Sequence, residues 1–169
     1  ISFYICITGA PRGSISTSED ELDVDVCIAE LRRVYKEDKA KVSLLPFYEE
    51  GHIDDIFVHL ELERQSGNTN EVSTKVLKHY SDMFSLEKKR GGPVFRVLVK
   101  GGPGSGKTTL STKIAYDWAQ GEGTQGTPPS GLDEVQLLFA LNMRLIEQDM
   151  TLVDAIFDQL LPYDSQISK

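Results

Sequence analysis

The chain has 169 residues, which is enough for one domain with a hydrophobic core. It carries 18 Lys and Arg against 26 Asp and Glu, a net charge of −8, and it has no basic stripe, which argues against nucleic acid as its main ligand. No stretch reaches the ~18 apolar residues of a membrane span, and the first residues lack the positive charges of a signal peptide.

The cysteine and histidine residues give no pattern of a metal or redox site. Cys6 and Cys27 have no CxxC spacing, so we expect two reduced thiols in or near the core of a cytoplasmic protein. His52, His59 and His79 lack metal-ligand spacing and are expected to be structural. Because the chain starts with isoleucine rather than methionine, we expect it to be a piece of a longer protein.

The first predicted element is an amphipathic helix over residues 19–37. Ser18 and Glu21 have the spacing of a capping box, which satisfies free N–H groups at the start of a helix. The apolar residues that follow share one helical face: Val24, Ile28, Leu31 and Tyr35.

The stretch before residue 94 gives weaker signals. Apolar and polar residues alternate over 55–63, which predicts a half-buried strand. Residues 65–70 have the composition of a loop, and residues 73–86 are predicted to form a second helix. The basic and glycine–proline residues 88–93 then mark a break in the chain.

From residue 94 the pattern becomes that of an α/β protein. Residues 94–99 form a short β-rich run that ends on a glycine loop. Leu110, Ile114 and Trp118 then recur at helical spacing, so we expect a helix with a buried stripe that ends near Gly121.

A second strand and a last helix follow the loop predicted over residues 121–131. Residues 135–141 are almost continuously apolar, as in a strand that is covered on both faces. Thr151 and Asp154 are expected to start a helix that Pro162 stops. Its inward-facing residues are predicted to be Leu152, Ile156, Phe157 and Leu160. This order of elements predicts the opening of a parallel sheet with flanking helices.

The two strands 94–99 and 135–141 raise the question of what pairs with them. An exposed apolar edge would associate with other chains, so we expect the chain to be poorly soluble alone. The alternative is that residues 1–90 fold back over the edge, with 55–63 as a substitute strand.

The motif Gly101-x4-Gly106-Lys107-Thr108 has the P-loop pattern and lies between a predicted strand and a predicted helix. Glycines allow the backbone N–H groups to turn inward around a phosphate, and the helix start adds partial positive charge. Lys107 supplies a full charge, Thr108 a hydroxyl for Mg²⁺, and Thr109 a hydroxyl for the α-phosphate. The expected nucleotide-binding residues are therefore Gly101, Gly102, Pro103, Gly104, Ser105, Gly106, Lys107, Thr108 and Thr109. A glycine-rich turn that merely joins strand to helix is the alternative.

No acidic residue ends an apolar run after residue 109, so we expect this chain not to hydrolyse nucleotide. The strand 135–141 ends instead in Asn142-Met143-Arg144. Arg144 either faces solvent, which is the more common case, or approaches a phosphate. Trp118 is expected in the core beside a capped or paired Asp117.

At this point the residues resemble a known family, the NACHT domain of NOD-like receptors. The resemblance covers about 94–162 and rests on Val97–Lys100 with GGPGSGKTTL, Lys113–Ala119, Leu137–Arg144 and Leu152–Ile156. Residues 44–48 and 55–58 are similar to the segment that precedes NACHT domains in expanded invertebrate receptor sets.

The resemblance implies a pre-NACHT segment over 1–90, of mixed α/β structure, and the first half of a P-loop NTPase domain over 91–169. It also implies binding of ATP or ADP with Mg²⁺, self-association through the NACHT domain, and a cytoplasmic sensor of innate immunity or cell death. Two alternatives stay open: a P-loop kinase-type phosphotransferase, and a helical interaction module in which nucleotide binding is incidental.

Overall fold

The computed structural model describes residues 3–8, 18–42, 50–66, 73–83, 96–121, 132 and 135–161. Its helices are α1 (Ser18–Asp38), α2 (Ile53–Ile56), α3 (Lys107–Gln120) and α4 (Leu152–Gln159), with 3-10 turns η1 (Tyr80–Met83) and η2 (Met143–Leu145). Its strands are β1 (Phe3–Thr8), β2 (Lys41–Val42), β3 (Gly51–His52), β4 (Leu62–Ser66), β5 (Ser73–Leu77), β6 (Arg96–Val99) and β7 (Leu137–Phe139). Several predictions fall wholly or partly outside the described residues: the pre-NACHT similarity at 44–48, the break at 88–93, the loop at 121–131, and Pro162.

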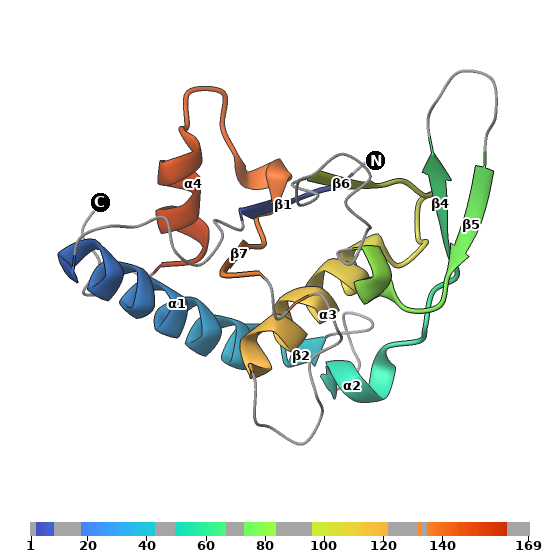
Figure 1. The fold of residues 1–169 in the computed structure, drawn as a ribbon, viewed down its shortest axis with the longest axis horizontal. Helices are drawn as coiled ribbons and strands as arrows, with labels where there is room; N and C mark the ends of the chain where they lie inside the picture. Colours follow the sequence, from blue (N-terminus) through green and yellow to red (C-terminus); the bar gives the residue numbers. More distant parts are fainter. Residues whose placement is uncertain are drawn as a thin grey trace.

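The main sheet has three strands in the order β6-β1-β7 (Figure 1). Strand β1 pairs antiparallel with both neighbours, so that Ile5 lies opposite Val97 and Ile7 lies opposite Leu138. Because β6 and β7 are both antiparallel to β1, they run in the same direction but do not pair. The prediction of a parallel sheet is therefore wrong for the strands that the structure describes, all of whose pairings are antiparallel.

Strand β1 also answers the question of the open edge. Residues 1–90 do fold back onto the two strands, but through β1 and not through 55–63. The outer edges of β6 and β7 have no neighbour among the described strands. The expected exposed edge therefore persists only on the outside of the sheet.

Helices α1 and α3 lie side by side beneath this sheet and form the core with it (Figure 1). The amphipathic pattern of α1 is confirmed, because Leu31 and Tyr35 are fully buried. The predicted stripe of α3 is also buried: Leu110, Ile114 and Trp118. Helix α3 ends before Gly121, as expected, where the backbone takes a positive φ of 67°.

Two hydrogen bonds tie these helices to the segment around β7. The Tyr35 hydroxyl donates to the carbonyl oxygen of Leu138 at 2.9 Å, and the Trp118 indole N–H donates to that of Val135 at 2.9 Å. The two rings also meet edge to face, with their centroids 5.9 Å apart. Buried aromatic side chains whose polar atoms have partners fix how α1 and α3 meet the sheet.

Two predictions in the first half are wrong. Most of residues 55–63 do not form a strand: α2 ends at Ile56, residues 57–61 have no regular structure, and Val58 is 76% exposed. Only Leu62 and Glu63 belong to a strand, as the first residues of β4. The predicted helix 73–86 begins instead as strand β5, which pairs with β4 in a hairpin. The β-branched residues Thr74 and Val76 favour a strand there.

For the last helix, the predicted start is confirmed, but one of the residues predicted to face inward does not. The Thr151 hydroxyl accepts from the Asp154 N–H at 3.1 Å, and the Asp154 carboxylate accepts from the Thr151 N–H at 3.1 Å, which is a complete capping box. Leu160 is buried, but Leu152 is 56% exposed, so the prediction that it faces inward is wrong.

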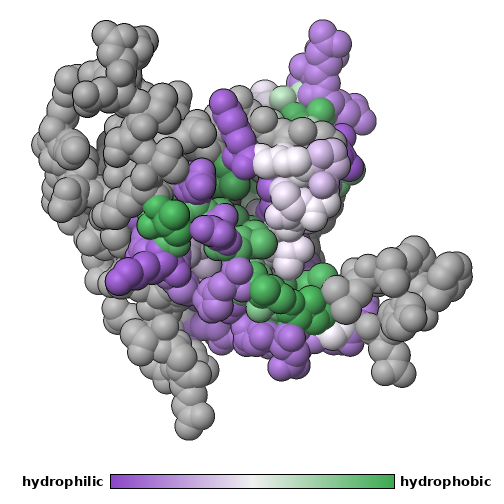
Figure 2. Space-filling view, turned by 90° about the vertical axis from the view of Figure 1, so that its right-hand side faces the viewer, coloured by the Kyte–Doolittle hydropathy of each residue, from purple (hydrophilic) through white to green (hydrophobic). Residues whose placement is uncertain are grey.

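The β4–β5 hairpin projects from one side of the molecule (Figure 1). On that face the described hydrophobic residues lie in small groups separated by hydrophilic ones (Figure 2). None of the described helices combines the length and the apolar character that crossing a bilayer demands.

Candidate functional site

The loop between β6 and α3 has the backbone that its glycines predict. Gly104 and Gly106 have positive φ angles of 72° and 78°, which residues with a Cβ adopt at a cost. A Cβ at Gly101 would lie 2.6 Å from the Ser105 Oγ, so a larger residue there would require that hydroxyl to turn away. Around Gly102 and Gly104 a Cβ would meet no atom within 4 Å, which leaves the backbone there open to a ligand.

The Lys107 side chain folds back across this loop. Its Nζ donates to the carbonyl oxygens of Gly101 at 2.8 Å and Gly102 at 2.6 Å, and to the Ser105 Oγ at 3.2 Å. The ammonium group therefore lies over the loop, where it donates only to neutral oxygens. A phosphate oxygen can take the place of one or more of these acceptors.

The start of α3 fits an anion. Its N-cap is Gly106, which offers no side-chain hydrogen bond, and its first turn contains no acidic residue. The first N–H groups of a helix have no partners within the helix, and they carry the positive end of its dipole. Thr108 is exposed at this end and Thr109 is half-buried. The free N–H groups can therefore donate to phosphate oxygens, and the threonine hydroxyls can contact the phosphates or their metal ion.

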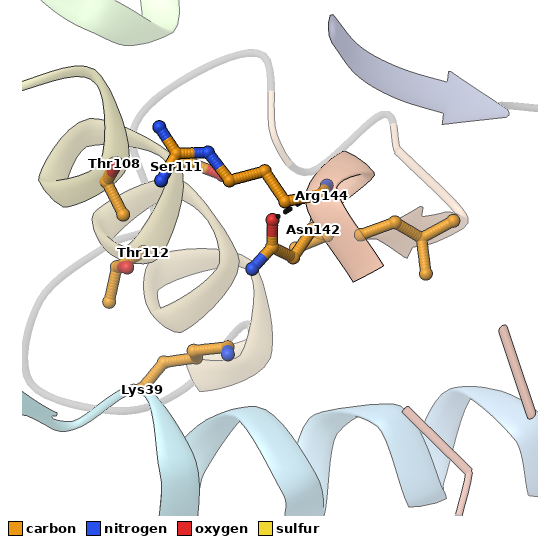
Figure 3. Close-up of a pocket in the computed structure, with 8 residues that line it drawn as sticks. Lys39, Thr108, Ser111, Thr112, Asn142 and Arg144 are labelled. Atoms are coloured by element: carbon orange, nitrogen blue, oxygen red, sulfur yellow. Dashed lines mark hydrogen bonds between the residues drawn. The ribbon is translucent and has the colours of Figure 1, made fainter. Parts of the chain in front are cut away.

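A cavity of about 250 Å³ opens next to Thr108, between α3, the end of α1 and the residues after β7 (Figure 3). Figure 3 shows the Arg144 side chain extending from η2 toward Thr108 and Ser111, with Lys39 on the opposite side near Thr112. The lining residues are Lys39, Thr108, Ser111, Thr112, Ala140, Leu141, Asn142 and Arg144. Arg144 is exposed, as the more common reading expects, and it also lines the cavity with Thr108; its approach to a phosphate stays a prediction.

A separate polar cluster joins residues 50–83 to the same helix. The Lys113 Nζ donates to the Asp54 carboxylate at 2.8 Å and to the Asp117 carboxylate at 2.6 Å, and the Tyr80 hydroxyl also donates to Asp117. Burial, and then the charge of Asp54, raise the pKa of Asp117 to about 7. The prediction that Asp117 is a paired carboxylate beside a core Trp118 is confirmed.

The histidines lie in aromatic contacts. The rings of His59 and His79 are 5.3 Å apart, and burial, then the neighbouring His59, lower the pKa of His79. Within the described residues, His, Cys, Asp and Glu form no group of three that could hold a metal ion.

The fold therefore places the loop residues 101–107, Thr108 and Thr109 at one helix start. Sequence reasoning missed Ser111, Thr112 and Lys39. The first two follow Thr108 by three and four positions, and this helical spacing could have revealed them. Lys39 reaches the cavity only through the packing of α1 on α3, so no local pattern indicates it.

Comparisons with known proteins relate part of the chain to one family. Residues 96–169 match the NACHT domain. Over 111 residues, which is 62% of this chain, the sequence is 34% identical to Protein NLRC5 of Mus musculus. The matched part spans 5% of that relative's length. No solved structure matches the chain significantly.

Proposed function

Since residues 96–169 belong to the NACHT family, we propose that this chain binds the phosphates of ATP or ADP through Gly101–Thr108 and forms part of a nucleotide switch. The observation that carries the proposal is the loop itself: two glycines with positive φ lead into a helix start without a side-chain cap, and Lys107 lies across them. The same arrangement has no evident role in packing, because Gly101–Ser105 are exposed.

Each site residue has a proposed task. The backbone N–H groups of Gly102, Gly104 and Gly106, and those of the first turn of α3, bind the β-phosphate. Lys107 leaves its carbonyl partners to bind the β- and γ-phosphates, Thr108 faces Mg²⁺, and Thr109 donates to the α-phosphate. When bound, Mg²⁺ neutralises charge on the phosphate oxygens.

For the whole protein we propose a sensor of the NOD-like receptor kind. The NACHT match and the similarity to NLRC5 support a switch that resides in the cytoplasm, self-associates through its NACHT domain and acts in innate immunity. We also propose that the domain has the P-loop NTPase fold, with its boundary near residue 90. Strand β1 and helix α1 then belong to a segment that shares a core with the domain.

The test is calorimetry with MgATP and MgADP on the chain and its Lys107→Ala variant. Loss of one charge-assisted contact costs about 1.5–3 kcal/mol, so the affinity should fall roughly 10- to 150-fold. Lys100→Ala is the matched control, because Lys100 is exposed at the start of the same loop but outside the motif, and its affinity should stay unchanged. Equal affinities of Lys107→Ala and the unmodified chain would overturn the proposal.

A further inference from the structure

Two cations that line the cavity beside Thr108, Lys39 and Arg144, have no acidic partner among the residues that the structure describes. No ion pair of these residues involves Lys39 or the Arg144 guanidinium, and the described lining of the cavity contains no Asp or Glu. Lys39 and Arg144 come from segments about 100 residues apart and line the same cavity. Like charges that share a cavity repel each other, and an anion between them removes that repulsion.

We propose that this cavity takes the terminal phosphate of a bound triphosphate, which Lys39 and Arg144 bind together with Lys107. The proposal rests on the function proposed above, because it takes the terminal phosphate of a bound triphosphate as the occupant. A free inorganic phosphate has the same chemistry and is the other possible source.

The chemistry of the lining fits a phosphate group. Thr108, Ser111 and Thr112 supply three hydroxyls from one face of α3, because residues three and four apart lie on the same side of a helix. An arginine fork and an ammonium group are the side chains that bind phosphate oxygens most strongly. At about 250 Å³, the cavity far exceeds the ~10–15 Å³ that one water requires, so a phosphate and its waters have room.

Arg144 is held in place by its neighbours. The Asn142 Oδ1 accepts from the Arg144 N–H at 3.1 Å and caps the short turn η2. Gln159 of α4 holds Asn142 from both sides: its Oε1 accepts from the Asn142 N–H at 2.8 Å, and its Nε2 donates to the Asn142 carbonyl at 3.3 Å. The turn that presents Arg144 to the cavity is therefore fixed to a helix.

Lys39 is linked to strand β7 through Tyr35. Its N–H donates to the carbonyl of Tyr35 at 3.0 Å, and the Tyr35 hydroxyl bonds Leu138 and accepts from the Ala140 N–H at 2.8 Å. The end of α1 and the segment that leads to Arg144 are thus joined by hydrogen bonds through Tyr35.

The consequence is a link between nucleotide state and α1. Lys39 lies outside residues 96–169, which match the NACHT domain. A phosphate bound between Lys39 and Arg144 would hold the end of α1 against α3 only while the terminal phosphate is present. The site would therefore distinguish ATP from ADP.

The experiment is calorimetry of MgATP, MgADP and inorganic phosphate with the unmodified chain, Lys39→Ala and Arg144→Ala. Lys36→Ala is the matched control, since Lys36 is exposed on α1 and is not among the lining residues of the cavity. We expect each cavity variant to bind MgATP about tenfold more weakly and MgADP as before, while the control binds both normally. Arg144→Lys, which keeps the charge, should restore part of the ATP affinity.

The outcomes separate the two proposals. If Lys107→Ala weakens both nucleotides but the cavity variants weaken neither, or both equally, the cavity assignment is overturned and the loop assignment stands. If the unmodified chain binds no nucleotide but binds inorganic phosphate through Lys39 and Arg144, the loop assignment fails and the cavity takes free phosphate. If neither ligand binds, both proposals fail.

Discussion

The Tyr35 hydroxyl lies 2.9 Å from the carbonyl oxygen of Leu138 and joins α1 to β7 across 103 positions of sequence. It also accepts from the Ala140 N–H at 2.8 Å, so one side-chain atom satisfies two backbone groups at the end of the strand. Burial raises the pKa of Tyr35 above its usual range, so the hydroxyl stays a donor at all pH values near neutrality. Strand β7 ends at Phe139, and the Tyr35 hydroxyl gives the next residue, Ala140, a hydrogen-bond partner in place of a neighbouring strand.

Removing that hydroxyl should destabilise the fold. Tyr35→Phe leaves two backbone groups without their partner, and we expect a loss of about 1–3 kcal/mol in unfolding free energy. Tyr116→Phe is the control, because its hydroxyl lies 3.1 Å from Nε2 of His52, whose side chain is 41% exposed and can turn to water. Urea unfolding of the two variants measures the difference. Equal losses would contradict the role given to Tyr35.

The loop offers a matched pair of glycines. A Cβ at Gly102 or at Gly104 would touch nothing within 4 Å, but only Gly104 has a positive φ. Gly104→Ala should therefore cost about 1–2 kcal/mol through backbone strain alone, and Gly102→Ala should cost little. Thermal unfolding of both variants tests this. A lower melting temperature for Gly102→Ala would show that the loop backbone differs from the one described.

Asp117 should make stability depend on pH. Its pKa is about 7 in the fold against a usual value of 3.8, so between these values the folded state holds a proton that the unfolded state has lost. Stability from this group is full below pH ~4 and is lost as the pH rises to about 7.

The amide of Asp117→Asn does not titrate, so the variant should lack this slope. Denaturant unfolding at pH 5 and pH 8 should find the variant less stable relative to the unmodified chain at pH 5 than at pH 8. Asp25→Asn, on an exposed position of α1, is the control. A difference that does not vary with pH would contradict the proton assigned to Asp117.

ATP turnover by this chain should be no faster than that of Lys107→Ala. Among the described residues, the lining of the cavity beside Thr108 offers hydroxyl, amide, cationic and apolar groups but no carboxylate that could orient a water molecule. Phosphate release measured over hours is the assay. A Lys107-dependent rate near 1 s⁻¹, which is common for enzymes, would mean that an acidic residue reaches the site after all.

Removing residues 1–8 should make the chain associate. Without β1, the facing edges of β6 and β7 lose their pairing, and unpaired apolar edges recruit other chains. Light scattering of the shortened chain should show larger species than the 169-residue chain. A monomeric, folded product would mean that β1 does not protect these edges.

The features that sequence could predict are those that depend on near neighbours. The capping box of Thr151 and Asp154 and the glycine loop before Lys107 are set by residues a few positions apart. Their side chains and backbone angles decide the structure locally, so spacing alone identifies them.

The features that sequence missed depend on distant contacts. The β1 segment shows no alternation that distinguishes a strand between β6 and β7 from other apolar stretches, and its place depends on partners about 90 and 130 residues later. Lys39 and Arg144 meet at one cavity only because Tyr35 docks α1 on β7. Residues 55–63 alternate as a strand does, but the His52 Nδ1 accepts from the Asp54 N–H at 3.3 Å and starts a helical turn instead.

The placement of β1 has a consequence for how the protein is made. This strand leaves the ribosome first among the three, yet β6 begins about 90 residues later. At roughly 5–20 residues per second, β1 waits on the order of 5–20 s for its first partner, and longer for β7. During that time its backbone groups are free to pair with other chains or to bind a chaperone. Slow synthesis should therefore lower the yield of folded protein, even though the finished sheet is closed at its centre.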